Sequence, residues 1–310
     1  MSKFRIRIKE HVREDYQPQY YLSLIILISA ALLLNFSISL ENKVIDQYNG
    51  TPVRIFLYLA LYSILYYLSC LFISIFKHEW NFWNSKKYWL LSLFGLFIMS
   101  LDRGFPYLHQ LANAFDQPFE VYRWIYRVCN HALAFFLVCL PLFLFYKFID
   151  KSPSYFYGLT RSSEVKPYLI LLVIALPLLV LASLFPSFTS YYPIYKSNDV
   201  STLLDWPSIL PMIIFEFFYG ADFLNVELLF RGFFVIGLSQ VLGRNSIMPM
   251  VVIYCALHFG KPVGEAISSI FGGYILGIIA YSTRSIWGGI LIHMGIAWLM
   301  ELTAYVSKQL

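Results

Sequence analysis

Long apolar runs dominate the chain and alternate with short polar stretches. A helix needs about 20 apolar residues to cross a hydrocarbon core roughly 30 Å thick. The runs that approach or exceed this length cover residues 21–40, 55–76, 88–101, 131–148, 168–188, 206–242, 247–259, 266–281 and 286–306. The run at 206–242 is too long for one simple span. The pattern therefore predicts an all-α, polytopic membrane helix bundle with eight or nine transmembrane segments.

The composition agrees with a membrane protein and excludes an ordinary soluble domain. Of the 310 residues, 59% are hydrophobic and only 13% are charged, whereas a soluble domain has about 25% charged residues. Before residue 166 the apolar runs carry almost no ionisable group in mid-span. After it, ionisable residues fall inside or at the ends of the runs. We therefore expect a scaffold at residues 1–150 and a second region at 151–310 that holds the chemistry.

The charge distribution predicts the orientation of the chain. The first run follows a basic start that contains Lys3, Arg5, Arg7, Lys9 and Arg13. That run is as long as a full span and has no small-residue cleavage site after it, so we expect an uncleaved anchor with a cytoplasmic N-terminus. With nine crossings, 14 of the 23 lysines and arginines lie on the cytoplasmic side and 8 on the other. The net charge of +5 fits this excess, so no nucleic-acid partner is expected.

An acid and a base lie inside the longest apolar run, in the segment VELLFRGF. A charged group in the middle of a membrane helix costs about 2.5–3.5 kcal/mol, so Glu227 and Arg231 need a reason to be there. They are four residues apart, which places them on one helix face where they can pair. A purely structural pair that ties two helices together explains them equally well.

Two histidines make a functional site more plausible than a purely structural ion pair. His258 ends one apolar run and His293 lies in the last one, so each belongs to a different helix from Glu227 and Arg231. A single histidine in an apolar helix is more often a hydrogen-bonded structural group. Three helices that each bring an ionisable group to similar depth would instead build a polar cavity, as in transporters and intramembrane enzymes.

Further ionisable residues are weaker candidates. Glu265 falls in the first turn of a helix, where the helix dipole alone favours an acid, and Lys261 precedes it in HFGKPVGE. Glu301 lies near the end of the last span and has a simple explanation as a residue that reaches toward the surface. Glu216 and Asp222 are expected to support the site or to line a pore.

At these positions the chain resembles the CPBP family of CAAX prenyl endopeptidases and bacteriocin-processing, Abi-type membrane proteins. The family pattern is two adjacent acids followed by three residues and then Arg, next Phe-x-x-x-His, and then His-x-x-x-Asn, on successive helices. The corresponding residues are Val226 to Arg231, Tyr254 to His258 and His293 to Ala297. The similar region covers about residues 208–302. The resemblance implies an integral protein of a bacterial cytoplasmic membrane.

The chain departs from the family pattern at three positions. Val226 replaces the first acid, which the family is thought to use to activate water. Ala297 replaces the Asn thought to help hold the oxyanion. Tyr254 replaces Phe, which looks like a minor change. The remaining candidates for catalysis are Glu227, Arg231, His258 and His293, with Glu265 as a group that could compensate.

Two kinds of chemistry fit these residues. Without a metal, Glu227 could be the base that activates water, although Arg231 opposes the rise in pKa that this role needs; if Arg231 instead held Glu265, Glu227 would be free. His258 could then orient the water and His293 could donate to the oxyanion. The alternative is zinc bound by Glu227, His258 and His293. There is no HExxH and Arg231 would lie beside the metal, so we expect no cofactor.

Three functions remain open at this point. The favoured one is an intramembrane endopeptidase that cuts membrane-embedded or lipidated peptides through a cavity of Glu227, Arg231, His258 and His293. The second is a catalytically weakened relative that binds a membrane protein partner, which Val226 and Ala297 favour. The third is a transporter of ions or small molecules, against which the absence of an inverted repeat argues. The expected partners are a membrane protein or peptide and the lipid bilayer.

Overall fold

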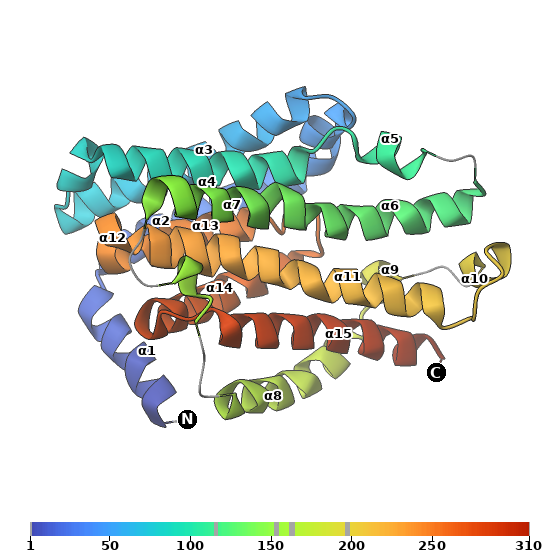
Figure 1. Cartoon of the computed structure of the whole chain (residues 1–310). Coiled ribbons are helices and arrows are strands. Elements are labelled where there is room, and N and C mark those ends of the chain that lie inside the picture. Colours follow the sequence, from blue (N-terminus) through green and yellow to red (C-terminus); the bar gives the residue numbers. More distant parts are fainter. Residues whose placement is uncertain (1, 115–116, 152–154, 161–164, 196–198, 310) are drawn as a thin grey trace.

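A computed structural model describes residues 2–114, 117–151, 155–160, 165–195 and 199–309. Within these ranges the chain forms helices and turns and contains no strand. Most of the helices run roughly alongside one another as a bundle (Figure 1). The predicted all-α membrane bundle is therefore confirmed as a fold class.

The N-terminal half of the bundle contains a short helix and four long helical segments. They are α1 (Ser2–Asp15), α2 (Pro18–Ile38), α3 (Val53–Lys77), α4 (Lys86–Gly104), and α6 (Phe119–Ala134), which continues through η4 (Phe135–Cys139), α7 (Leu140–Phe145) and η5 (Tyr146–Asp150). A π-type turn, η1 (Leu40–Ile45), follows α2, and the short α5 (Leu108–Ala112) precedes α6.

The C-terminal half carries the motif residues. Its longer elements are α8 (Lys166–Ala182), α11 (Leu210–Glu227), η7 (Leu228–Gly237), α13 (Ile247–Ala256), α14 (Val263–Thr283) and α15 (Trp287–Gln309). The shorter ones are η6 (Phe156–Gly158), α9 (Pro186–Tyr191), α10 (Val200–Leu203) and α12 (Ser239–Leu242). The long apolar run at 206–242 is helical from Leu210 onward, and this segment ends at Leu242, before Gly243 with a φ of +56°.

Six helical segments among the described residues are long and apolar enough to cross a bilayer. They are Pro18–Ile38, Val53–Lys77, Phe119–Asp150, Leu210–Ala256, Val263–Thr283 and Trp287–Ser307. The number is below the expected eight or nine for identifiable reasons. Helix α4 has two charged residues at each end, α8 has 17 residues, and α13 is joined to the long segment before it.

The most buried elements are α13, in which all ten residues are buried, and the π-type segment η7, in which nine of the ten are buried. Phe233 and Phe234 pack so closely on α4 that a Cβ at Gly95 would lie 2.7 Å and 2.8 Å from their rings. By contrast, α2 and α8 expose large apolar side chains such as Leu33 and Val173. Such surfaces are expected where helices face lipid.

The two halves share one hydrophobic core. The largest cluster of buried residues takes side chains from α2, α3 and α4 and also from η7 and α13. Helix α3 packs directly on α13, and α4 on η7. The expected division into residues 1–150 and 151–310 therefore stays a prediction, because the hydrophobic core contains side chains from both regions.

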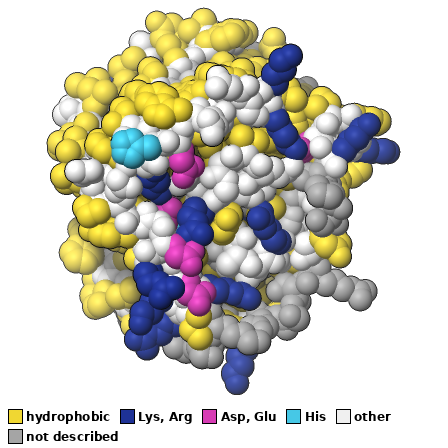
Figure 2. Space-filling model, turned by 90° about the vertical axis from the view of Figure 1, so that its left-hand side faces the viewer, with side chains coloured by type: hydrophobic (Ala, Val, Ile, Leu, Met, Phe, Trp, Pro, Cys, Tyr) yellow, Lys and Arg dark blue, Asp and Glu magenta, His cyan; other side chains and the backbone are white. Residues whose placement is uncertain are grey.

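One end of the bundle gathers many of the charged side chains. Figure 2 shows this end, where Lys and Arg side chains surround a row of Asp and Glu. Residues from α1, the end of α3 and the 243–246 turn meet here, including Lys77 and Arg244. The loops that the sequence places on the predicted cytoplasmic side therefore lie together in space.

The packing of η7 generates a first prediction. A Cβ at Gly232 would lie 2.6 Å from the carbonyl oxygen of Tyr157 and 3.1 Å from its Cβ. We expect Gly232→Ala to destabilise the protein by about 1–3 kcal/mol through overpacking, measured as a lower midpoint of thermal unfolding in detergent. Gly272→Ala on α14 is the matched control, because a Cβ there meets nothing within 4 Å. Equal midpoints for the two variants would contradict the close approach.

Candidate functional site

The acid and base of the first motif form a buried ion pair. Glu227 ends α11 and Arg231 lies in the first turn of η7, with 3.0 Å between Glu227 Oε1 and Arg231 Nη1. Their side chains are 0% and 1% exposed. The contact is not aligned as a hydrogen bond, and the three guanidinium nitrogens have no well-aligned acceptor among the described residues. Arg231 therefore keeps donors in addition to the ion pair.

His293 from α15 joins the same carboxylate. Its Nδ1 lies 3.0 Å from Glu227 Oε1, and its Nε2 lies 2.9 Å from the hydroxyl of Tyr254 on α13. An ionised carboxylate can only accept a hydrogen bond, so Nδ1 must carry the proton. Nε2 is then an acceptor, and the Tyr254 hydroxyl donates to it. The result is a continuous chain from hydroxyl to imidazole to carboxylate, drawn from three helices.

Tyr254 also contacts the cation of the pair. The guanidinium carbon of Arg231 lies 4.2 Å from the centre of the Tyr254 ring, within cation–π distance. From the sequence, Tyr254 looks like a minor replacement for Phe, and its hydroxyl is not predicted as a functional group. The one sequence feature that could have indicated this role is the hydroxyl that Tyr254 adds at a motif position where the family has Phe.

His258 is held by the same tyrosine but does not touch the acid. It lies in the turn after α13, and its Nδ1 is 2.8 Å from the backbone oxygen of Tyr254. A carbonyl oxygen only accepts, so Nδ1 donates and Nε2 is left as an acceptor. Burial, together with the nearby charge of Lys261, lowers the pKa of His258 well below its usual value. His258 is therefore a neutral imidazole beside the site.

Glu265 belongs to a separate cluster. Its carboxylate accepts from Lys261 Nζ at 2.5 Å and from the Tyr192 hydroxyl at 2.8 Å. Burial disfavours the charged form of Lys261, but the carboxylate of Glu265 helps to outweigh this, and the pKa of Lys261 is raised. The expectation that Arg231 could hold Glu265 is wrong, because each already has its own ion partner.

Of the three other intramembrane acids, Glu301 and Asp222 have structural partners. Glu301 is buried and accepts hydrogen bonds from the backbone of Ile194 at 2.8 Å and 2.9 Å, so the explanation as a residue that reaches toward the surface is wrong. Asp222 lies 2.9 Å from His131 Nδ1. Glu216 is half-buried, and its Oε2 has no hydrogen-bond partner within the described part of the chain. None of these acids joins Glu227.

Two of the three positions that depart from the family pattern, Val226 and Ala297, also lie in apolar surroundings. Val226 packs against the main hydrophobic core. Ala297 is 3% exposed and packs with Phe215 and Tyr219. No polar side chain therefore takes the place of the first acid or of the Asn at these two positions.

The donor atoms at this site do not converge as zinc ligands. Glu227 Oε1 is shared by Arg231 and the protonated Nδ1 of His293, and the Nδ1 of His258 faces a carbonyl oxygen. Zinc requires lone pairs directed at a common point. Over the residues that the structure describes, no three or more His, Cys, Asp or Glu side chains are placed to hold a metal ion.

Close helix packing makes the cluster possible. A Cβ at Gly289 on α15 would overlap Glu227 Oε2, so only glycine lets α15 approach the carboxylate this closely. The N-terminal half fixes the turn that carries His258. Asn35 Nδ2 donates to the backbone oxygen of Phe259 at 3.0 Å, and the ion pair of Glu41 with Arg103 lies against Gly260.

A comparison with protein families adds independent support. Residues 205–299 match the model of type II CAAX prenyl endopeptidase Rce1-like proteins. This match covers about a third of the chain and supports the resemblance to the CPBP family. No curated protein and no solved structure matches the chain.

The family match covers the whole candidate site. It includes Glu227, Arg231, His258, Glu265 and His293 and agrees closely with the region at 208–302 expected from the motifs. The apolar helices and the similarity to a family of membrane proteases support an integral membrane protein. The roles of the individual side chains have to be argued from their geometry.

The buried pair generates a second prediction. Arg231→Met alone should destabilise the protein by about 3–5 kcal/mol, because it leaves the carboxylate of Glu227 without its cation, and Glu227→Met should do the same to Arg231. The double variant should lose less stability than either single variant, since it removes both charges. Thermal and denaturant unfolding in detergent would measure the cycle. If the loss of stability in the double variant equalled the sum of the two single losses, the two groups would not stabilise each other.

Proposed function

We propose that this protein is an intramembrane endopeptidase that hydrolyses membrane-embedded or lipidated peptides. The observation that carries the proposal is the chain of contacts from Tyr254 through His293 to Glu227. A hydroxyl, an imidazole and a carboxylate in this order are suited to proton transfer. The family match supplies the reaction class.

In the proposed reaction His293 is the general base and Glu227 acts through it. Nε2 of His293 takes a proton from water, and the hydroxide attacks the scissile carbonyl carbon. Glu227 stabilises the imidazolium that forms, because its Oε1 already accepts from Nδ1. The imidazolium then gives the proton to the leaving nitrogen, so the products are a carboxylic acid and an amine. His293 is also the more accessible group, with 17% of its side chain exposed against 0% for Glu227.

Two donors could stabilise the tetrahedral oxyanion in the absence of the family Asn. When a water molecule donates to Nε2 of His293 in place of the Tyr254 hydroxyl, that hydroxyl is free to donate to the oxyanion. Arg231 has guanidinium nitrogens without an aligned acceptor and lies over the same ring. Oxyanion donors typically contribute about 10²–10³-fold to the rate. In this proposal the free Nε2 of His258 orients the attacking water.

The proposed mechanism uses no metal. Its support is the shared Glu227 oxygen and the proton on Nδ1 of His293, which leave no common point for a metal ion. A chelator should therefore leave the activity of the purified protein unchanged. Loss of activity on chelation, restored by zinc, would favour the alternative.

The third prediction tests hydrolysis directly. Purified protein in liposomes would be given a quenched fluorescent peptide that ends in a prenylated CAAX sequence, with the unprenylated peptide in parallel. Glu227→Gln and His293→Gln should each lower the turnover by about 10²–10⁴-fold, the usual contribution of a general base and its partner. Glu216→Gln is a matched control, because Glu216 lies on the same long helical segment as the site and touches none of its groups.

The assay distinguishes a wrong substrate from a wrong mechanism. The same three variants would be compared in cell membranes by sequencing new protein termini. Termini that vanish in Glu227→Gln and persist in Glu216→Gln support hydrolysis even where the test peptide is not cut. Identical termini in all membranes, with every variant folded, would rule hydrolysis out.

The fourth prediction concerns the hydroxyl of Tyr254. Tyr254→Phe restores the family residue and keeps the ring over Arg231, so the fold should be unchanged. We expect turnover to fall by about 10–10³-fold with little change in KM, because the lost hydroxyl acts only in the transition state. Activity equal to that of the unaltered protein would assign Tyr254 a packing role alone.

A second candidate function rests on the two apolar positions of the motif. Val226 and Ala297 are packed among hydrophobic side chains, and Glu227 is fully buried. A protein that uses the family fold to bind a membrane partner would need no polar groups there. Co-purification in mild detergent would test this function, with a stoichiometric partner retained by both the unaltered protein and Glu227→Gln.

A further inference from the structure

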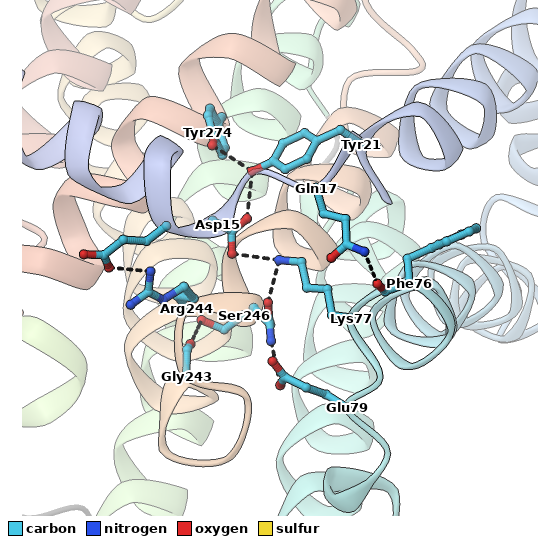
Figure 3. Close-up of polar contacts among 12 residues, drawn as sticks. Asp15, Gln17, Tyr21, Phe76, Lys77, Glu79, Gly243, Arg244, Ser246 and Tyr274 are labelled. Carbon is cyan, nitrogen blue, oxygen red and sulfur yellow. Dashed lines mark hydrogen bonds and ion pairs between the residues drawn. The ribbon is translucent and has the colours of Figure 1, made fainter. Parts of the chain in front are cut away.

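The N-terminal helix α1 is fastened at its C-terminal end by a buried polar network (Figure 3). Asp15 binds Lys77 of α3 at 2.7 Å and accepts from the Tyr21 hydroxyl at 2.8 Å. Lys77 also donates to Asn245 at 2.8 Å, and Tyr21 contacts Tyr274 of α14 at 2.9 Å. The end of α1 is therefore tied to α3, α14 and the 243–246 turn.

One face of α1 is covered by the bundle. His11 is 7% exposed and its ring packs edge-on against Tyr274 and Tyr281 of α14. Ile8 contacts the main hydrophobic core. These contacts fix the rotation of the helix about its axis, so the direction of its other side chains is set as well.

Another face of α1 carries three basic residues in a row. Arg5, Lys9 and Arg13 are four residues apart and exposed. None of them forms an ion pair within the described ranges. Of the acids on α1, Glu10 is exposed and forms no ion pair within the described residues, while Glu14 binds Arg244 at 2.6 Å and Asp15 binds Lys77 at 2.7 Å. The basic row therefore remains available to an external anion.

This row borders an apolar groove between α1 and α8. The groove has a volume of about 680 Å³, and α8 contributes Ile170, Leu171 and Ile174 to its wall. Figure 1 shows that α8 begins beside the N-terminal end of α1. Cationic groups therefore lie next to an apolar wall on a helix expected to face lipid.

We infer that this groove binds an anionic phospholipid. Its acyl chain would lie along the apolar side chains of α8 and its phosphate would contact the three basic side chains of α1. Basic residues beside a membrane helix recognise anionic headgroups in this way, and a bound chain adds the burial of apolar surface. Charge decides between occupants of similar shape, because a neutral lipid or a cationic peptide leaves the basic row unpaired. The inference is independent of the proposed proteolysis.

The test compares lipid binding by the full chain and two triple variants. Purified protein in detergent would be titrated with phosphatidylglycerol or phosphatidylcholine, and bound lipid counted by native mass spectrometry. Arg5→Gln, Lys9→Gln and Arg13→Gln combined should weaken phosphatidylglycerol binding by at least about tenfold, since each basic residue near an anionic lipid contributes roughly fivefold. Phosphatidylcholine binding should be unchanged. This is the fifth prediction.

The control removes three exposed basic residues from the opposite end of the bundle. Lys43→Gln, Arg123→Gln and Lys308→Gln combined should keep the binding of phosphatidylglycerol. If both triple variants lost phosphatidylglycerol binding equally, the loss would be explained by the lower total charge, and the proposed site would be overturned. Full binding by the α1 variant would overturn it too. Inorganic phosphate tests the headgroup alone: competition at concentrations similar to those of the lipid would assign the site to free phosphate and overturn lipid binding.

Discussion

The centre of this bundle depends on keeping two opposite charges satisfied where water is scarce. Glu227 and Arg231 have exposed fractions of 0% and 1%, so neither can rely on solvent. A buried ion pair is tolerated only when further polar contacts compensate for the lost hydration. His293 and the ring of Tyr254 provide these contacts, from α15 and α13. Helices far apart in the sequence must therefore meet at one depth.

The same requirement explains why the N-terminal half matters to the site. The turn that carries His258 interrupts the helix among buried residues, and its backbone groups need partners. Asn35 supplies one of them at Phe259, and the ion pair of Glu41 with Arg103 packs on Gly260. The scaffold thus sets the position of His258 without contributing a group to the reaction.

The departures from the family pattern fit a rearranged set of roles. Val226 and Ala297 have no polar atoms, so two groups that relatives are thought to use are missing. Tyr254 adds a hydroxyl that bonds to His293. In the proposed reaction the carboxylate acts through an imidazole, and the tyrosine and arginine replace the missing amide. The pairing of Glu227 with Arg231, which opposes a role for the acid as a direct base, is compatible with this arrangement.

The sequence alone predicted the membrane bundle, a possible pairing of Glu227 with Arg231 and the resemblance to the CPBP family, because apolar run lengths, four-residue helix spacing and local motifs are all short-range properties. It could not assign partners to Glu265 or Glu301, and it undervalued Tyr254. Those outcomes depend on which helix faces which: Lys261 and Tyr192 reach Glu265, and the backbone of Ile194 reaches Glu301. Only the tertiary structure decided them, since a hydrogen bond between distant segments requires a distance and a direction that spacing along one helix does not contain.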